Sequence, residues 1–231
     1  MYYFEDAAVL PAPLPLAACA ASAPWKLRRL PGPPGLRGMA VDFAESGSPS
    51  REPLEQHVAA SFASAYGARI THFMPQLMSL RDRLGELIAV CGLRDAGAEQ
   101  LFLETYLDLP PETVLEAVTG RAVDRGSLME VGNLAISRPG MARYLIAALT
   151  EHLHRMGKEW AVFTAVPTLV NAFSRLGVRL VFLGRADIGR LPEGERADWG
   201  RYYESEPVVA AANVQQSRAA VHAKALPVPA P

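Results

Sequence analysis

One acidic residue, Glu130, stands inside a segment that otherwise has the apolar character of a strand, with Leu128 and Val131 on either side. A carboxylate in such a segment is neutral, paired or functional, because burying an unpaired charge is costly. Burial also raises a carboxyl pKa toward the range in which proton transfer is useful. The alternative is an outward-facing side chain that pairs with Arg121 or Arg125.

Three residues further on, Asn133 follows Gly132. Its amide is suited to holding an amine substrate, and it is equally suited to satisfying the backbone of a β-bulge. Glu130 and Asn133 are therefore the two candidate catalytic residues.

The next segment, SRPGMAR at 137–143, has the composition of a phosphate-binding turn at the beginning of a helix. Free backbone N–H groups and the positive helix end attract phosphate, and Gly140 lets the backbone approach it. Pro139 removes one donor, and the same letters also fit a plain Pro-Gly turn. The candidate phosphate-binding residues are Ser137, Arg138, Gly140, Met141, Ala142 and Arg143.

Apolar periodicity predicts the elements that hold these residues. Parallel strands need a long crossover connection, which is usually a helix. The helices expected between strands therefore predict a parallel strand pair in a mixed sheet flanked by helices. Strands are expected at 69–77, 84–93, 127–137, 160–166 and 178–183, and helices at 54–66, 111–119, 141–156 and 167–176, while 99–107 fits either type.

Composition limits the class of protein. The chain has 231 residues, 50% of them hydrophobic, and a net charge of −1, which argues against a mainly electrostatic nucleic-acid binder. A Pro/Ala-rich arm is expected at 1–52, a folded domain at 53–209 and a flexible tail at 210–231. The two cysteines, Cys19 and Cys91, are expected to be unpaired thiols.

No segment has the length and apolarity of a membrane span. The run 9–25 is interrupted by prolines, and Glu5 and Asp6 precede it where a signal peptide carries basic residues. A cytoplasmic location is therefore expected. Metal chemistry is not expected, because His152 and His154 point to different faces of one helix.

The order of the expected strands and helices and the 137–143 turn together resemble the GNAT acyltransferases, in which two parallel strands splay apart around an acyl thioester. The resemblance implies that Glu130 is a general base on the attacking amine, that the strand backbone near Ala135 pairs with the pantetheine amides, and that Asn171 contacts the pantetheine arm. Two positions depart from the pattern. Ser137 stands where Gln or Arg is usual, and Phe173 stands where a tyrosine normally protonates the leaving thiolate, a role for which Tyr202 or Tyr203 is the candidate replacement.

Four blocks, HFMPQL at 72–77, LFLETYLDLP at 101–110, MEVGNLA at 129–135 and WGRYYESEPVV at 199–209, resemble the thermostable hemolysin family. The resemblance implies a GNAT-like fold, α/β with a largely antiparallel sheet, related to acyl-homoserine-lactone synthases. His72, Glu104 and Asp108 are the candidate acceptor-binding residues. The alternatives are a partly buried, satisfied histidine and two acids exposed at the ends of a short element.

The expected activity is N-acyl transfer from acyl carrier protein or acyl-CoA to a small amine, of which an amino-acid derivative is one candidate. No permanent cofactor is expected; acyl-CoA or acyl-phosphopantetheine is the co-substrate. Two other classes stay open: a membrane-active hemolysin and a catalytically inactive GNAT-like binding module.

Overall fold

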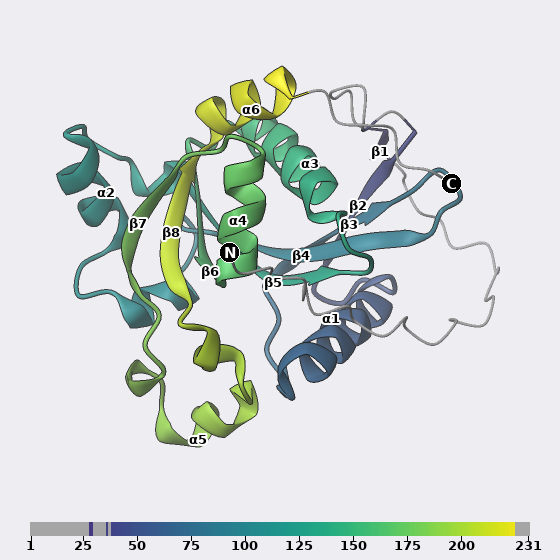
Figure 1. The fold of residues 1–231 in the computed structure, drawn as a ribbon, viewed down its shortest axis with the longest axis horizontal. Coiled ribbons are helices and arrows are strands. Elements are labelled where there is room, and N and C mark those ends of the chain that lie inside the picture. The colour runs from purple at the N-terminus through teal and green to yellow at the C-terminus, as the bar shows by residue number, and fades with distance from the viewer. Residues whose placement is uncertain (1–27, 30–35, 37, 225–231) are drawn as a thin grey trace, which may run out of the picture.

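The computed structural model describes residues 28–29, 36 and 38–224, and these form one mixed sheet with helices on both faces (Figure 1). The strand order is β1-β2-β3-β4-β5-β6-β8-β7, and only the β5/β6 pair is parallel. The strands are β1 (Arg28–Arg29), β2 (Ala40–Glu45), β3 (Gln76–Arg81), β4 (Leu87–Asp95), β5 (Leu128–Ile136), β6 (Trp160–Ala165), β7 (Leu180–Arg185) and β8 (Val208–Asn213). The predicted mixed sheet with one parallel pair is confirmed.

Three helices pack on one face of the sheet and two on the other. α3, α4 and α6 contribute to the largest apolar cluster, while α1 and α2 pack into two clusters on the opposite face. The helices are α1 (Arg51–Tyr66), α2 (Pro111–Thr119), α3 (Ala142–Arg155), α4 (Pro167–Arg175), the short α5 (Glu193–Arg196) and α6 (Val214–Ala223).

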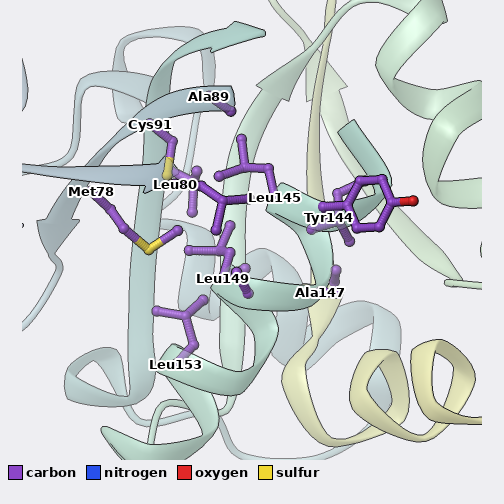
Figure 2. Packing of buried hydrophobic residues seen from close by; sticks show 14 of the residues in the cluster. Met78, Leu80, Ala89, Cys91, Tyr144, Leu145, Ala147, Leu149 and Leu153 are labelled. Atoms are coloured by element: carbon purple, nitrogen blue, oxygen red, sulfur yellow. The ribbon is translucent and has the colours of Figure 1, made fainter. Parts of the chain in front are cut away.

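The centre of the main core is the inner face of α3. Leu145, Leu149 and Leu153 recur every four residues, so they form one stripe along the helix. Figure 2 shows this stripe directed at the sheet, where it meets Met78 and Cys91 of β3 and β4. Burial of this stripe fixes α3 against the sheet and so fixes the position of the turn that precedes it.

The parallel strands β5 and β6 pair over only part of their length. Their register runs from Leu128 opposite Trp160 to Val131 opposite Phe163 and ends there, although β5 continues to Ile136 and β6 to Ala165. Beyond Val131 the two strands diverge, and each remains paired with its other neighbour.

The folded region extends beyond the predicted bounds of 53–209. β2 lies within the sheet, and β8 inserts between β6 and β7 before the chain continues into α6. The strand predicted at 69–77 begins instead at Gln76, because Pro75 lacks the N–H that a ladder needs. Most of the predicted arm, including Cys19, and residues 225–231 lie outside the described residues, whereas Cys91 is a buried free thiol.

Candidate active site

A cavity of about 660 Å³ opens where β5 and β6 diverge. Its wall includes Glu130 and Tyr106, whose neighbours belong to the α2 face, and also Leu149, Phe163 and Ala212 of the α3 face. The cavity therefore passes through the sheet at the gap between the parallel strands. A ligand bound in this cavity would contact side chains from both faces of the sheet.

Glu130 lies at the gap on β5 and is only 2% exposed. Its carboxylate accepts the backbone N–H of Phe102 at Oε2 and that of Leu103 at Oε1, both at 2.9 Å. The Arg94 Nη1 atom lies 4.0 Å from Oε2. These contacts exclude the outward-facing alternative, and Arg125 pairs instead with Glu104 and Glu112.

Burial raises the pKa of the Glu130 carboxyl above its ordinary value. The two backbone N–H groups and the charge of Arg94 act in the opposite direction, but burial dominates. A carboxyl group held in a fixed orientation, with a raised pKa and facing a cavity, has the properties of a general base.

Asn133 occupies a β-bulge between β4 and β5, with φ of 47°. Its Oδ1 atom accepts the Met74 N–H at 2.7 Å, and its Nδ2 atom donates to the His72 carbonyl at 3.4 Å. Asn133 therefore positions the 72–74 segment over the bulge, as the bulge alternative predicts. Both Asn133 and the exposed His72 line the cavity.

Aromatic side chains line the part of the cavity wall beside Glu130. We call the set Tyr66, Phe102, Tyr106, Trp199, Tyr202 and Tyr203 the aromatic vestibule. Its rings contact one another: Phe102 stacks on Trp199 with centroids 5.8 Å apart, and Tyr66 meets Tyr202 edge-on at 5.1 Å. The sequence reading did not assemble this set, because its members come from three segments far apart in the chain.

Arg94 is a further residue that sequence reasoning did not place in the site. It lines the cavity beside Glu130, and its Nε atom is buried without a hydrogen-bond partner, although the Glu99 carboxylate lies 3.5 Å away. Its signal in the sequence was a charged residue near the end of an apolar strand.

The two tyrosines considered as replacements for Phe173 line the same cavity as Glu130. Tyr203 shares a hydroxyl–hydroxyl hydrogen bond with Tyr106, and burial raises the pKa of Tyr203 to about 12. Its phenol therefore stays protonated at neutral pH. Phe173 stacks on Phe163, with ring centroids 4.9 Å apart, on the α3 face.

The candidate phosphate turn lies between β5 and α3. Gly140 has a φ of 78°, and no atom approaches the position of a Cβ there within 4 Å, so the turn is open. Ala142 begins α3 and lines the cavity, as does Ala135 on β5. Arg138 pairs with Asp82 at 3.1 Å, and the Ser137 hydroxyl lies 3.3 Å from Nε2 of His57.

Met141 and Arg143, the remaining residues of this segment, lie at the beginning of α3. Met141 stands just before α3, and the Arg143 guanidinium lies over the Tyr144 ring, 4.9 Å from its centroid. The open turn and the first N–H groups of α3 are compatible with a phosphate, since the first turn of a helix has unpaired donors.

Eight predicted site residues do not line the cavity: Ser137, Arg138, Gly140, Met141 and Arg143 of the turn, and Glu104, Asp108 and Asn171 elsewhere. Asn171 is exposed on α4, while the carboxylate of Glu104 pairs with Arg125 at 2.5 Å and that of Asp108 pairs with Arg190. Asp108 and Asn171 are exposed, as polar groups at the surface of short elements usually are. Within the part of the chain that the structure describes, no group of three His, Cys, Asp or Glu residues could hold a metal ion.

Family and fold comparisons agree with this architecture. The sequence matches the thermostable hemolysin family over residues 44–218. The chain belongs to the thermostable hemolysin family. The match spans the cavity-lining segments of the sheet, α1, α3 and α4 and continues into α6, so the site described above lies within the family's shared region. No curated protein matches the sequence.

Solved structures of acyl-transferring synthases have the same fold as this family member. FeeM, an N-acyl amino acid synthase from uncultured soil microbes, aligns with a TM-score of 0.55 and 16% identity over 78% of this chain and 93% of its own. The AHL synthase LasI aligns with a TM-score of 0.54 and 14% identity over 83% of this chain and 98% of its own. TofI, crystallised with an inhibitor and MTA, aligns with a TM-score of 0.51 and 16% identity over 78% of this chain and 95% of its own. At these identities the similarity establishes the fold, which is GNAT-like.

Proposed function

We propose that the chain transfers an acyl group from an acyl thioester to the amine of a small acceptor. The observation that carries the proposal is the cavity at the β5/β6 gap, with the buried carboxylate of Glu130 in its wall. A thioester placed in the gap has its carbonyl close to β5 and its acyl chain among the apolar side chains of the α3 face. This arrangement agrees with the activities named for FeeM and LasI.

The reaction needs one base and no metal. Ionised Glu130 takes a proton from the acceptor's ammonium group, and the free amine attacks the thioester carbonyl carbon. The C–N bond forms, and the nitrogen loses a second proton as it becomes an amide, which restores the acid that protonates the leaving group. The C–S bond breaks, and the thiolate leaves with the bonding electron pair and takes up one proton. Tyr202 and Tyr203, both protonated at neutral pH, are the candidate donors for that proton.

The charges beside the aromatic vestibule favour an amino acid or a close derivative as the acceptor. Glu130 offers a negative group to an ammonium, and Arg94, which lines the cavity beside it, offers a guanidinium whose Nη1 atom lies 4.0 Å from Glu130 and whose Nε atom lies 3.5 Å from Glu99. A zwitterion satisfies both, since guanidinium groups bind carboxylates in a planar, directional manner. The rings of the vestibule provide apolar surface for the rest of the acceptor.

The donor's phosphate is proposed to bind at the 137–143 turn. Arg138 is 53% exposed and paired with Asp82, so it can exchange that partner for a phosphate. Arg69 pairs with Asp198, while Arg94 lies in the cavity wall, so these two arginines do not share a face for an acidic carrier protein. CoA and acyl carrier protein therefore remain alternative donors.

The test is the loss of product on neutralising Glu130. Extracts of cells that express the wild type, Glu130→Gln and the matched control Glu86→Gln are compared by mass spectrometry for N-acyl compounds. Glu86 is exposed near the β3/β4 turn, outside the cavity wall. We expect at least a hundredfold less product with Glu130→Gln, in line with the roughly 10²–10⁴-fold contribution of a general base, and no loss with Glu86→Gln.

Two results would overturn this proposal. One is wild-type product from a folded Glu130→Gln protein, and the other is the absence of any N-acyl compound that depends on the wild-type chain. Circular dichroism of the purified variant establishes that it is folded.

A further inference from the structure

The end of the cavity farthest from the phosphate turn contains two hydroxyl groups. It is bounded by the C-terminal half of α3 and the beginning of α6, through Thr150, Leu153, Val214 and Ser217. Thr150 lies eight residues after Ala142, which corresponds to about 12 Å along the helix. An acyl chain that enters near the turn reaches this end with its distal carbons.

Ser217 has a buried hydroxyl with no protein partner. The residue is 4% exposed, and its Oγ atom makes no hydrogen bond to any of the described residues. A hydroxyl buried in this way is unfavourable, and most buried polar side chains are satisfied. The adjoining wall, formed by Leu149, Leu153 and Ala212, is apolar, so it offers no alternative partner.

Thr150 provides the complementary half of a hydroxyl site. Its Oγ1–H donates to the Ile146 carbonyl at 2.7 Å, which leaves the oxygen lone pairs as acceptors. Ser217 has an unused O–H donor at the same end of the cavity. A ligand hydroxyl accepts from one residue and donates to the other, whereas a carbonyl oxygen satisfies Ser217 only. A lone water held by these two hydroxyls would make two hydrogen bonds, fewer than the roughly three that a buried water typically makes.

We infer that the acyl donor carries a hydroxyl group on the distal half of its chain, and that Ser217 and Thr150 bind it. This inference rests on the proposed function, because it takes the α3-face pocket as the acyl-chain pocket. It adds a specificity that the β5/β6 gap and Glu130 do not determine. A plain alkyl chain leaves the Ser217 hydroxyl unsatisfied, and a hydroxylated one does not.

The experiment measures binding rather than turnover. Purified full-length protein is titrated by calorimetry with saturated fatty acids of eight to fourteen carbons and with the corresponding acids hydroxylated at each distal carbon. We expect at least one hydroxylated acid to bind about three- to tenfold more tightly than the plain acid of equal length, as one net hydrogen bond gives.

Two variants assign that preference to Ser217. Ser217→Ala is expected to abolish it while leaving the affinity for the plain acid unchanged, and to raise Tm without ligand, because it removes an unsatisfied hydroxyl and places alanine in a helix. Ser61→Ala is the matched control: Ser61 lines the same cavity from α1, and its hydroxyl donates to the His57 carbonyl. This variant should keep the preference.

The inference is wrong if no hydroxylated acid binds more tightly than its plain counterpart, if the preference survives Ser217→Ala, or if no acid in the series binds. Because binding does not require Glu130, these outcomes are read independently of the product analysis. A preference that disappears with Ser217→Ala supports the inference even if Glu130→Gln still forms product, and in that case only the proposed chemistry fails.

Discussion

At the scale of single residues, Glu130 gives a prediction about pH and stability. Because its pKa is raised by folding, the folded protein holds this proton to a higher pH than the unfolded chain does. As pH rises from the ordinary glutamate value near 4.5 to the raised folded value, the wild type therefore loses free energy of unfolding relative to Glu130→Gln. Above the folded pKa the difference is constant.

The measurement is the difference in Tm between wild type and Glu130→Gln, followed from pH 4 to pH 8. Each unit of pKa shift corresponds to about 1.4 kcal/mol of lost stability. The sign is decisive: a wild type that gains stability relative to the variant as pH rises would show that the two backbone N–H groups and Arg94 outweigh burial.

Residue type alone did not predict location. A lone acid among apolar residues made Glu130 a candidate buried carboxylate, with an outward-facing side chain as the alternative, and the structure shows it buried. Glu104 and Asp108 carry the same functional group, but their ion pairs with Arg125 and Arg190 join segments distant in sequence. Nothing local in the sequence distinguishes an acid that lines a cavity from one that forms a surface ion pair.

At the scale of elements, the junction of β4 and β5 depends on glycine. Gly92 and Gly132 stand opposite each other, and Met74 covers both. A Cβ on Gly92 would lie 2.5 Å from Met74 Cβ, which belongs to a segment held by Asn133. A Cβ on Gly132 would clash with the terminal methyl of Met74 at 2.3 Å and make ordinary contacts with the rest of that side chain. The terminal methyl can rotate away, and the Cβ cannot.

We therefore expect Gly92→Ala to lower the free energy of unfolding by about 1–3 kcal/mol, the usual effect of overpacking, and Gly132→Ala to cost clearly less. Urea denaturation of the two variants measures the difference. Equal destabilisation would mean that the 72–74 segment is not fixed over the bulge.

Periodicity predicted most elements but not their order in the sheet. The helix expected at 111–119 coincides with α2, and the one at 141–156 contains α3, because caps and apolar spacing are local signals. Composition predicts a flexible tail at 210–231, but the alanine-rich segment after 210 forms the end of β8 and then α6, since small side chains suit a strand enclosed between β6 and β7. Pairing of this kind depends on distant strands, so local patterns do not reveal it.

At the scale of the whole molecule, adjacent alanines on β8 face different environments. Ala212 lines the cavity, while Ala211 is buried in the apolar cluster on the opposite face. Ala212→Leu should fill the acyl pocket at little cost in stability and shift fatty-acid binding to shorter chains. Ala211→Leu should cost about 1–3 kcal/mol without changing chain-length preference.

Thermal unfolding and calorimetry with saturated fatty acids measure both effects. If both variants lose stability and neither changes the preferred length of the bound fatty acid, the α3-face pocket does not receive the acyl chain.

No described helix is long and apolar enough to cross a bilayer. A cytoplasmic location remains a prediction. Any red-cell lysis linked to this family is, on the proposed function, expected to come from an amphiphilic product.

The passage through the sheet also bears on how a reaction cycle ends. On the proposed function, an N-acyl product formed at the gap would be threaded, with its head group among the aromatic rings on one face and its tail beneath α3 on the other. Release then requires one end to be drawn between β5 and β6. Bulky acceptors or long chains should therefore leave slowly, and the width of this opening, rather than bond formation, would limit turnover.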